Sequence, residues 1–231
     1  MQQQFFINNW VSLSASAQCD EQTLPISPAR FDKTQLPKLA WVPAMQRRRL
    51  SPFAKMALYC AQQASEGINA QLPSIFCSRH GDLHKTSVLL EDLAQNEALS
   101  PTAFSLSVHN AVSGLFTILT KNQQATNTVV AGKNTLLMAI NDAYARINSG
   151  LAEQMLIVHC DQALPELYLP YADELQIDHS VAFIMSLQPL NENSRPVSLN
   201  ALTSQLKPNE NGLPQALQLN QWLTCQPSSA E

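Results

Sequence analysis

Charged side chains are scarce in this sequence. Asp, Glu, Lys and Arg make up 14% of its 231 residues, whereas globular domains usually carry roughly 25%. Apolar residues make up 45%, which is enough for a sizeable core and excludes a disordered chain. Because so little charge is present to solvate the exterior, we expect a partner to cover part of the surface.

The sequence also lacks a basic face. Its net charge of −4 argues against a general nucleic-acid binder, which needs basic residues to neutralise phosphates. The only basic run is Arg47, Arg48 and Arg49. Such a run is typical of a solvated helix start, and a contact with a phosphate or a carrier protein is the alternative.

Long apolar runs and a secretory signal are missing. No stretch approaches the roughly 20 apolar residues that a membrane helix requires. Residues 1–4 are polar and uncharged, unlike the start of a secretory signal. The five cysteines follow no repeated spacing: Cys19, Cys60, Cys77, Cys160 and Cys225. Free thiols in a reducing compartment explain them most simply, so we expect a cytoplasmic protein without stable membrane insertion.

Motifs for cofactors and metals are absent as well. The sequence has no GxGxxG stretch and no phosphate-binding loop, so we expect no nucleotide cofactor. The spacing of Cys77, His80 and His84 could suggest metal ligands. Gly81 interrupts this segment and no third ligand is confirmed, so we expect ordinary polar loop residues and no metal site.

A hydrolase is a further interpretation. Ser107 and His109 lie close in sequence and Asp142 follows downstream, but no Gly-x-Ser-x-Gly turn is present. Proximity in sequence does not make a triad, because a triad is defined by geometry. The alternative is a packed helix start in which His109 and Asn110 bond to the backbone.

The sequence does contain an alternation of strands and helices. Strands are expected at residues 5–14, 73–78, 126–131, 155–159 and 181–187. Helical spacing predicts helices over 52–66, 85–96, 104–119 and 133–147. Ser51 caps the first helix and Gly67 ends it; Val88, Leu89 and Leu93 share one face of the second. This order predicts an α/β layered fold with a largely parallel sheet.

The most informative element is VVAGKNTLLMAI, residues 129–140. A buried strand there runs through a tight turn directly into a buried helix. Free N–H groups and the helix dipole at such a helix N-terminus lower the pKa of a thiol, so the turn suits a nucleophile. Its residues are Ala131, Gly132, Lys133 and Asn134, with neither cysteine nor serine.

This arrangement resembles the N-terminal half of β-ketoacyl synthases, in which the strand ends in a Thr-Ala-Cys-type turn and the cysteine accepts the acyl chain. The same family fits RRRLSPFAKMAL (47–58), SRHGDLHKTSVLLEDLA (78–94) and LSPTAFSLSVHNAVSGLFTI (99–118). The last stretch is similar to truncated ketoacyl-synthase-like chain length factors encoded beside aryl polyene pathways. The resemblance covers residues 5–188 and implies a thiolase-like half: a mostly parallel five-stranded sheet with helices on both faces.

The resemblance also implies a protein that is not an enzyme. Its register places Lys133 where the family has its nucleophile. The second half of a full synthase would supply two histidines that activate the malonyl carrier protein, and none of the five histidines here matches them: His80, His84, His109, His159 and His179. Decarboxylative condensation needs a thiolate and these donors, so no catalytic residue is expected. Lys133 then points outward, lies at a subunit seam, or pairs with an acidic group of a partner.

The implied partner is a full-length β-ketoacyl synthase, and acyl carrier protein is reached through the complex. In such synthases the strand before the nucleophile pairs antiparallel with its copy in the other subunit. The corresponding residues, which include no charge or proline to block edge pairing, are Thr126, Asn127, Thr128, Val129, Val130 and Ala131. Three further residues would lie beside the partner's acyl tunnel or else pack in the core: Phe104, Leu115 and Phe116.

We expect a ketoacyl-synthase-like half-domain over residues 1–188 and a polar, partly irregular tail over 189–231, with an amphipathic patch at 217–223. Helix 133–147 is apolar on most sides and needs cover from the tail, a partner or both. Exposing such side chains would cost roughly 1.5–3 kcal/mol each. The expected function is a chain length factor in aryl polyene biosynthesis. The alternatives are an acyltransferase or hydrolase using Ser107 or a displaced cysteine, and a pure scaffold.

Overall fold

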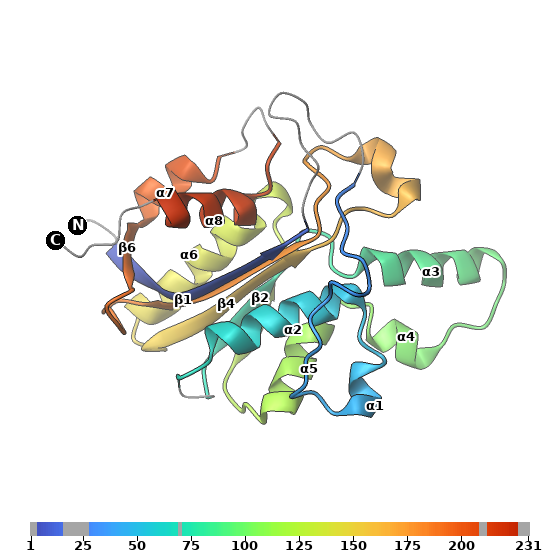
Figure 1. Ribbon diagram of the computed structural model, residues 1–231, viewed down its shortest axis with the longest axis horizontal. Coiled ribbons are helices and arrows are strands. Elements are labelled where there is room, and N and C mark those ends of the chain that lie inside the picture. Colours follow the sequence, from blue (N-terminus) through green and yellow to red (C-terminus); the bar gives the residue numbers. More distant parts are fainter. Residues whose placement is uncertain (1–3, 16–27, 69–70, 208–211, 226–231) are drawn as a thin grey trace.

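A six-stranded mixed sheet organises the described part of the chain (Figure 1). The structure is a computed structural model and describes residues 4–15, 28–68, 71–207 and 212–225. The strands, in their order across the sheet, are β3 (Thr126–Val129), β2 (Ser74–Cys77), β4 (Gln154–Asp161), β5 (His179–Ser186), β1 (Gln4–Ser14) and β6 (Arg195–Ser198).

The sheet differs in detail from the prediction of five mostly parallel strands. The pairs β2–β3 and β2–β4 are parallel, while β4–β5, β5–β1 and β1–β6 are antiparallel. Parallel neighbours need a crossover, usually a helix. The connection from β4 to β5 contains only the short 3-10 helix η2 (Glu166–Tyr171), so the chain returns antiparallel beside β4. The α/β layering itself is as predicted.

Helices cover both faces of the sheet, as Figure 1 shows. They are α1 (Ala44–Arg47), α2 (Pro52–Ala64), α3 (Leu83–Ala94), α4 (Pro101–Ser105), α5 (Ala111–Thr120), α6 (Thr135–Asn148), α7 (Leu199–Gln205) and α8 (Gln215–Cys225). Helices α6, α7 and α8 pack on one face, which we call the α6 side, and α2 and α5 pack on the other, the α2 side.

The predicted start and end of α2 are confirmed. Ser51 Oγ accepts a hydrogen bond from the N–H of Ala54 (3.2 Å), and Pro52 occupies the first turn. Pro has no N–H to leave unsatisfied there, which makes it favourable. The helix ends at Ala64, and Gly67 beyond it adopts a left-handed φ of 78°. Its apolar face packs with Phe76 and Phe116 in the α2-side core.

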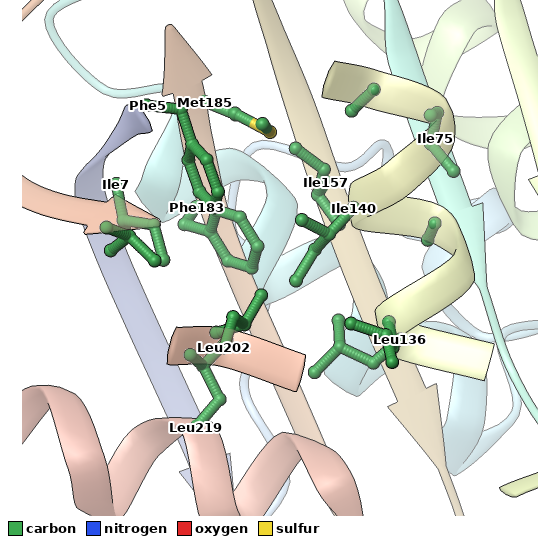
Figure 2. Close-up of a cluster of buried hydrophobic side chains, with 14 of the residues drawn as sticks. Phe5, Ile7, Ile75, Leu136, Ile140, Ile157, Phe183, Met185, Leu202 and Leu219 are labelled. Carbon is green, nitrogen blue, oxygen red and sulfur yellow. The ribbon is translucent and has the colours of Figure 1, made fainter. Parts of the chain in front are cut away.

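The C-terminal segment covers α6. The α6-side core combines α6 with the sheet and with α7 and α8, as Figure 2 shows for Ile140, Phe183, Leu202 and Leu219. Strand β6 pairs with β1, so residues beyond 188 also join the sheet. The amphipathic patch predicted at 217–223 lies within α8. Residues 208–211 and 226–231 of the predicted tail lie outside the described residues.

One helix prediction needs correction, and one predicted helix face is only partly buried. The segment 104–119 is two helices, because the chain leaves α4 at Leu106 and α5 begins only at Ala111. Ser107 Oγ donates to the carbonyl of Phe104 (2.9 Å), a local bond that competes with continued helix. On α3, Leu89 is buried whereas Val88 and Leu93 are exposed. Figure 1 shows that α3 projects away from the sheet, which accords with the exposure of these two side chains.

In the described part of the chain, every helix is too short or too polar to cross a bilayer.

Candidate functional site

The strand–turn–helix predicted around residue 130 is present. Strand β3 leads through residues 130–134, which we call the junction turn, into α6, with Gly132–Asn134 forming the short 3-10 helix η1. Thr135 fastens the turn: its Oγ accepts from the N–H of Ala131 (2.9 Å) and donates to the carbonyl of Gly132 (2.8 Å). Gly132 has a φ of 57°, which favours glycine. No thiol or hydroxyl lies among residues 130–134.

Lys133 projects from this turn into an ion pair within the chain. Its Nζ lies 3.0 Å from Asp173 Oδ2 and donates to the Asp173 carbonyl at 3.3 Å. Asp173 Oδ1 also lies 2.8 Å from Arg79 Nη2, and Arg79 Nη1 lies 3.2 Å from Glu174. The amine predicted to point outward or to meet a partner therefore has an acidic neighbour in its own chain.

Two adjacent carboxyls respond differently to these cations. The hydrogen bond from Arg79 lowers the pKa of Asp173 to about 2, with Lys133 adding to the effect and partial burial opposing it. Burial raises the pKa of Glu174, although Arg79 acts in the opposite direction. Asp173 is thus the anion that holds the two cations together.

A buried carboxylate lies behind this ion-pair network. Asp161, the last residue of β4, accepts from Ser78 Oγ (2.7 Å) and from the N–H groups of Arg79 (3.0 Å) and His80 (3.1 Å). Burial alone would raise the pKa of Asp161, but His159, His179 and these donors outweigh it and hold that pKa below its usual value. The loop that carries Arg79 is therefore fixed to the end of β4.

Two buried histidines complete this cluster. His159 Nε2 lies 3.3 Å from Asp161 Oδ2, and the His159 and His179 rings stack with centroids 5.5 Å apart. Burial lowers the pKa of His159 to about 4, although Asp161 acts to raise it. His159 is therefore neutral near pH 7. Together with Asp161 and His179 it forms a group that could hold a metal ion.

The cysteines are poorly placed for catalysis. Burial raises the pKa of Cys60 to about 12, and it also raises the pKa values of Cys77 and Cys160, with Asp161 adding to both. These thiols stay protonated at neutral pH and are weak nucleophiles. Cys225 is exposed at the end of α8. Cys19 lies outside the described residues.

The other predicted candidates are not brought together. Ser107 Oγ donates to Phe104, and Asp142 pairs with Arg146 (2.9 Å) on α6. Among the described residues, no hydrogen bond joins Ser107, His109 and Asp142 to one another, so the structure gives no support for a triad. His84 Nε2 lies 2.8 Å from the carbonyl of Ala163, and neither it nor Cys77 belongs to the metal-capable group.

Strand β3 lies at one edge of the sheet. It pairs only with β2 among the described strands. The N–H of Ser74 bonds to the carbonyl of residue 125 and that of Ser78 to the carbonyl of Val129. In a parallel ladder with this register, the peptide groups of Thr126 and Thr128 point away from β2. The edge is therefore open at these two residues.

The three residues considered for an acyl tunnel lie in different environments. Leu115 lines a mainly apolar cavity of about 210 Å³ between α2, α4 and α5. Phe104 is 59% exposed on α4. Phe116 is buried with its ring centroid 5.6 Å from that of Phe76, as a core residue would be.

Sequence reasoning missed the cluster at the ends of the strands. His159 and Asp161 are two residues apart on β4 and so share a face, which their spacing alone could have indicated. His179 joins them only through the β4–β5 register, in which it lies opposite Asp161. Asp173 lies in a loop far from Arg79 and Lys133 in sequence, and no motif marks it.

The layered sheet and the strand–turn–helix define an α/β thiolase-like protein, as the sequence predicted. The profile of the family described as β-ketoacyl synthase, N-terminal domain, matches residues 21–230. The chain belongs to this family. No curated protein sequence matches it significantly.

Solved structures agree on the fold. One is a ketosynthase (ApeO) in complex with its chain length factor (ApeC) from Xenorhabdus doucetiae, with 26% identity and a TM-score of 0.72, covering 98% of this chain and 93% of that one. The ishigamide ketosynthase/chain length factor has 15% identity and a TM-score of 0.60, covering 79% of this chain and 62% of that one. A β-ketoacyl synthase from Burkholderia phymatum STM815 has 11% identity and a TM-score of 0.54, covering 66% and 46%.

Proposed function

We propose that this chain is a non-catalytic chain length factor that forms a heterodimer with a full-length β-ketoacyl synthase. The observation that carries the proposal is its match, over 98% of its length, to the structure of a ketosynthase with its chain length factor. The match spans 93% of that neighbour, so the two chains are also similar in extent.

The absence of catalysis is supported by the junction turn. Where the family resemblance puts an acyl-accepting cysteine, this chain has Lys133, whose amine pairs with Asp173 at 3.0 Å. A cationic amine in an ion pair is not a nucleophile for thioesters at neutral pH. The buried thiols of Cys60, Cys77 and Cys160 do not replace it, because burial raises their pKa values.

Strand β3 is the proposed contact with the synthase. Its outer edge offers the peptide groups of Thr126 and Thr128, and its residues carry no charge that would repel a second strand. An antiparallel partner strand added here would continue the sheet across the subunit boundary. Val130 and Ala131, the first residues of the junction turn, follow the strand and would extend the same contact.

We further propose that α4 and α5 help to shape the partner's acyl tunnel. Leu115 is the best placed of the three candidates, because it already lines an apolar cavity. Phe104, exposed on α4, would meet the partner's surface. Phe116 packs on Phe76 and would thereby help to hold the neighbouring Leu115 in position.

The proposed substrate class is an aryl polyene chain carried on acyl carrier protein. It rests on the likeness of residues 99–118 to chain length factors of such pathways. The acyl carrier protein would be bound by the complex, with the synthase supplying the nucleophile and the histidines. We therefore also propose that the chain acts in the cytoplasm, where both proteins are made.

Co-expression with a full-length β-ketoacyl synthase encoded beside this chain tests the proposal. We expect a stable complex whose intact mass equals one copy of each subunit, and condensation of acyl and malonyl carrier proteins by the complex but not by the isolated chain. Failure to co-purify with any such synthase would argue against a chain length factor. Condensation by the chain alone, or its stoichiometric labelling by a thiol- or serine-reactive acyl probe, would favour an enzyme.

A further inference from the structure

Three metal-ligating side chains converge at one end of the sheet. His159 and Asp161 are two residues apart on β4 and point to the α6 side, in phase with Met155 and Ile157 of that core. His179 lies opposite Asp161 in the β4–β5 register. Each residue offers one ligand atom, and these atoms all lie within 4.8 Å of one another. All three residues are buried.

Two buried ring nitrogens in this group lack a hydrogen-bond partner in the described structure, Nδ1 of His159 and Nε2 of His179. His179 Nδ1 lies 2.7 Å from the carbonyl of Ile177. A carbonyl only accepts, so Nδ1 carries the proton and Nε2 presents its lone pair. Nε2 is buried and has no hydrogen-bond partner in the described structure. A ligating histidine usually donates its other ring N–H to a carbonyl in this way.

The carboxylate is also held as a ligand would be. Ser78 Oγ and the N–H groups of Arg79 and His80 fix Asp161 from the side of the loop. Donors of this kind orient ligating carboxylates. His179 and Asp161 are both buried and offer ligand atoms within 4.8 Å of each other, and a cation between them would neutralise the carboxylate.

We propose that His159, Asp161 and His179 bind one divalent transition-metal ion of the zinc class. Two imidazoles and one carboxylate are ligands that suit Zn²⁺ or Co²⁺ rather than Mg²⁺ or Ca²⁺. The role is structural: the ion ties the end of β4 to the start of β5. Through Asp161 it also fixes the loop whose Arg79 reaches Asp173. This inference does not depend on the proposed function.

Metal analysis of the full-length chain, with any histidine tag removed, tests the proposal. The protein is freed of metal with a chelator, incubated with Zn²⁺ and passed through gel filtration. We expect about one zinc per chain and a rise in Tm of about 5–10 °C, with no rise for Mg²⁺. Co²⁺ in place of zinc should give the visible absorption of a four-coordinate site.

Two histidine variants locate the ion. His179→Gln should lose the bound zinc and the rise in Tm. His84→Gln is the matched control, because His84 bonds to Ala163 outside the group and should keep both. Zinc retained by His179→Gln, or a folded wild-type chain that carries no zinc after reconstitution, would overturn the proposal. If His179→Gln does not fold, the zinc content and cobalt spectrum of the wild-type chain decide alone.

Discussion

Lys133 Nζ lies 3.0 Å from Asp173 Oδ2, so the amine of the junction turn is paired with a carboxylate from the loop between β4 and β5. The same carboxylate holds Arg79 at 2.8 Å. This shared anion links the start of α6 to the loop after β2. A lysine at a helix N-terminus is disfavoured by the helix dipole, and Asp173 offsets that disadvantage.

Replacing Lys133 by alanine should change little. Both partners of the ion pair are partly exposed, and such pairs contribute about 0–1 kcal/mol to the free energy of unfolding. Asp173→Asn should cost more than Lys133→Ala, because Arg79 then also loses one of its two carboxylate partners. Urea unfolding of both variants measures the difference, and yield of the complex with a synthase is the second readout. A marked loss of complex in Lys133→Ala alone would mean that the amine contacts the partner.

The network around Asp173 should weaken in acid. The pKa of Asp173 is about 2 in the folded chain and about 3.9 for an unperturbed Asp, so the unfolded state takes up the proton first. The contribution is complete above about pH 5 and is lost as the pH falls toward about 2. Because Asp173 is about half exposed, the effect stays below about 1 kcal/mol. The stability difference between wild type and Asp173→Asn, measured from pH 5 to pH 2, should shrink; a constant difference would contradict the assignment.

Cover of α6 by the C-terminal segment can be tested with one side chain. Leu219 on α8 is fully buried in the α6-side core (Figure 2). Leu219→Ala should lower the free energy of unfolding by about 2–5 kcal/mol. Leu151→Ala is the control, since Leu151 is exposed and its loss should cost under about 0.5 kcal/mol. Equal effects in the two variants would mean that α8 does not cover α6 in solution.

The open edge of β3 leads to a prediction about the complex. Thr128→Pro removes a peptide N–H that points away from β2, so the sheet inside the chain should persist while pairing with a second strand is blocked. We expect loss of co-purification with the synthase and a circular dichroism spectrum close to wild type. Thr128→Val keeps the N–H and should keep the complex. A complex that survives Thr128→Pro would place the contact elsewhere.

Product length should respond to Leu115 rather than to Phe116. Leu115→Phe fills an existing cavity, so the complex should make shorter acyl chains, as measured by mass spectrometry of carrier-bound products. Leu90→Phe, on the exposed side of α3, is the control. Phe116→Ala removes a ring packed on Phe76 and should cost about 3–5 kcal/mol, so a change there would not report on a tunnel. If Leu115→Phe leaves the length of the products unchanged, the result would favour a chain that acts only as a scaffold.

The sequence by itself determined the order of elements and the chemistry of the junction turn. Helical and strand spacing placed α2, β3, α6 and β5 close to their observed bounds, because these depend on local caps and periodicity. The sequence alone showed that the turn contains Lys133 and neither cysteine nor serine. The break between α4 and α5 was not predicted, because the apolar pattern continues through it. The hydroxyl of Ser107 bonds to the backbone there, which competes with continued helix.

Only the tertiary structure decided what surrounds these elements. The antiparallel return of β5 beside β4 brought His179 opposite Asp161, and a loop between them brought Asp173 to both Arg79 and Lys133. Strand register and loop path depend on contacts between residues far apart in sequence, which spacing does not encode. The same reason explains why Leu202 and Leu219 of the C-terminal segment enter the core, whereas its polar composition predicted a partly irregular tail as one of the covers for helix 133–147.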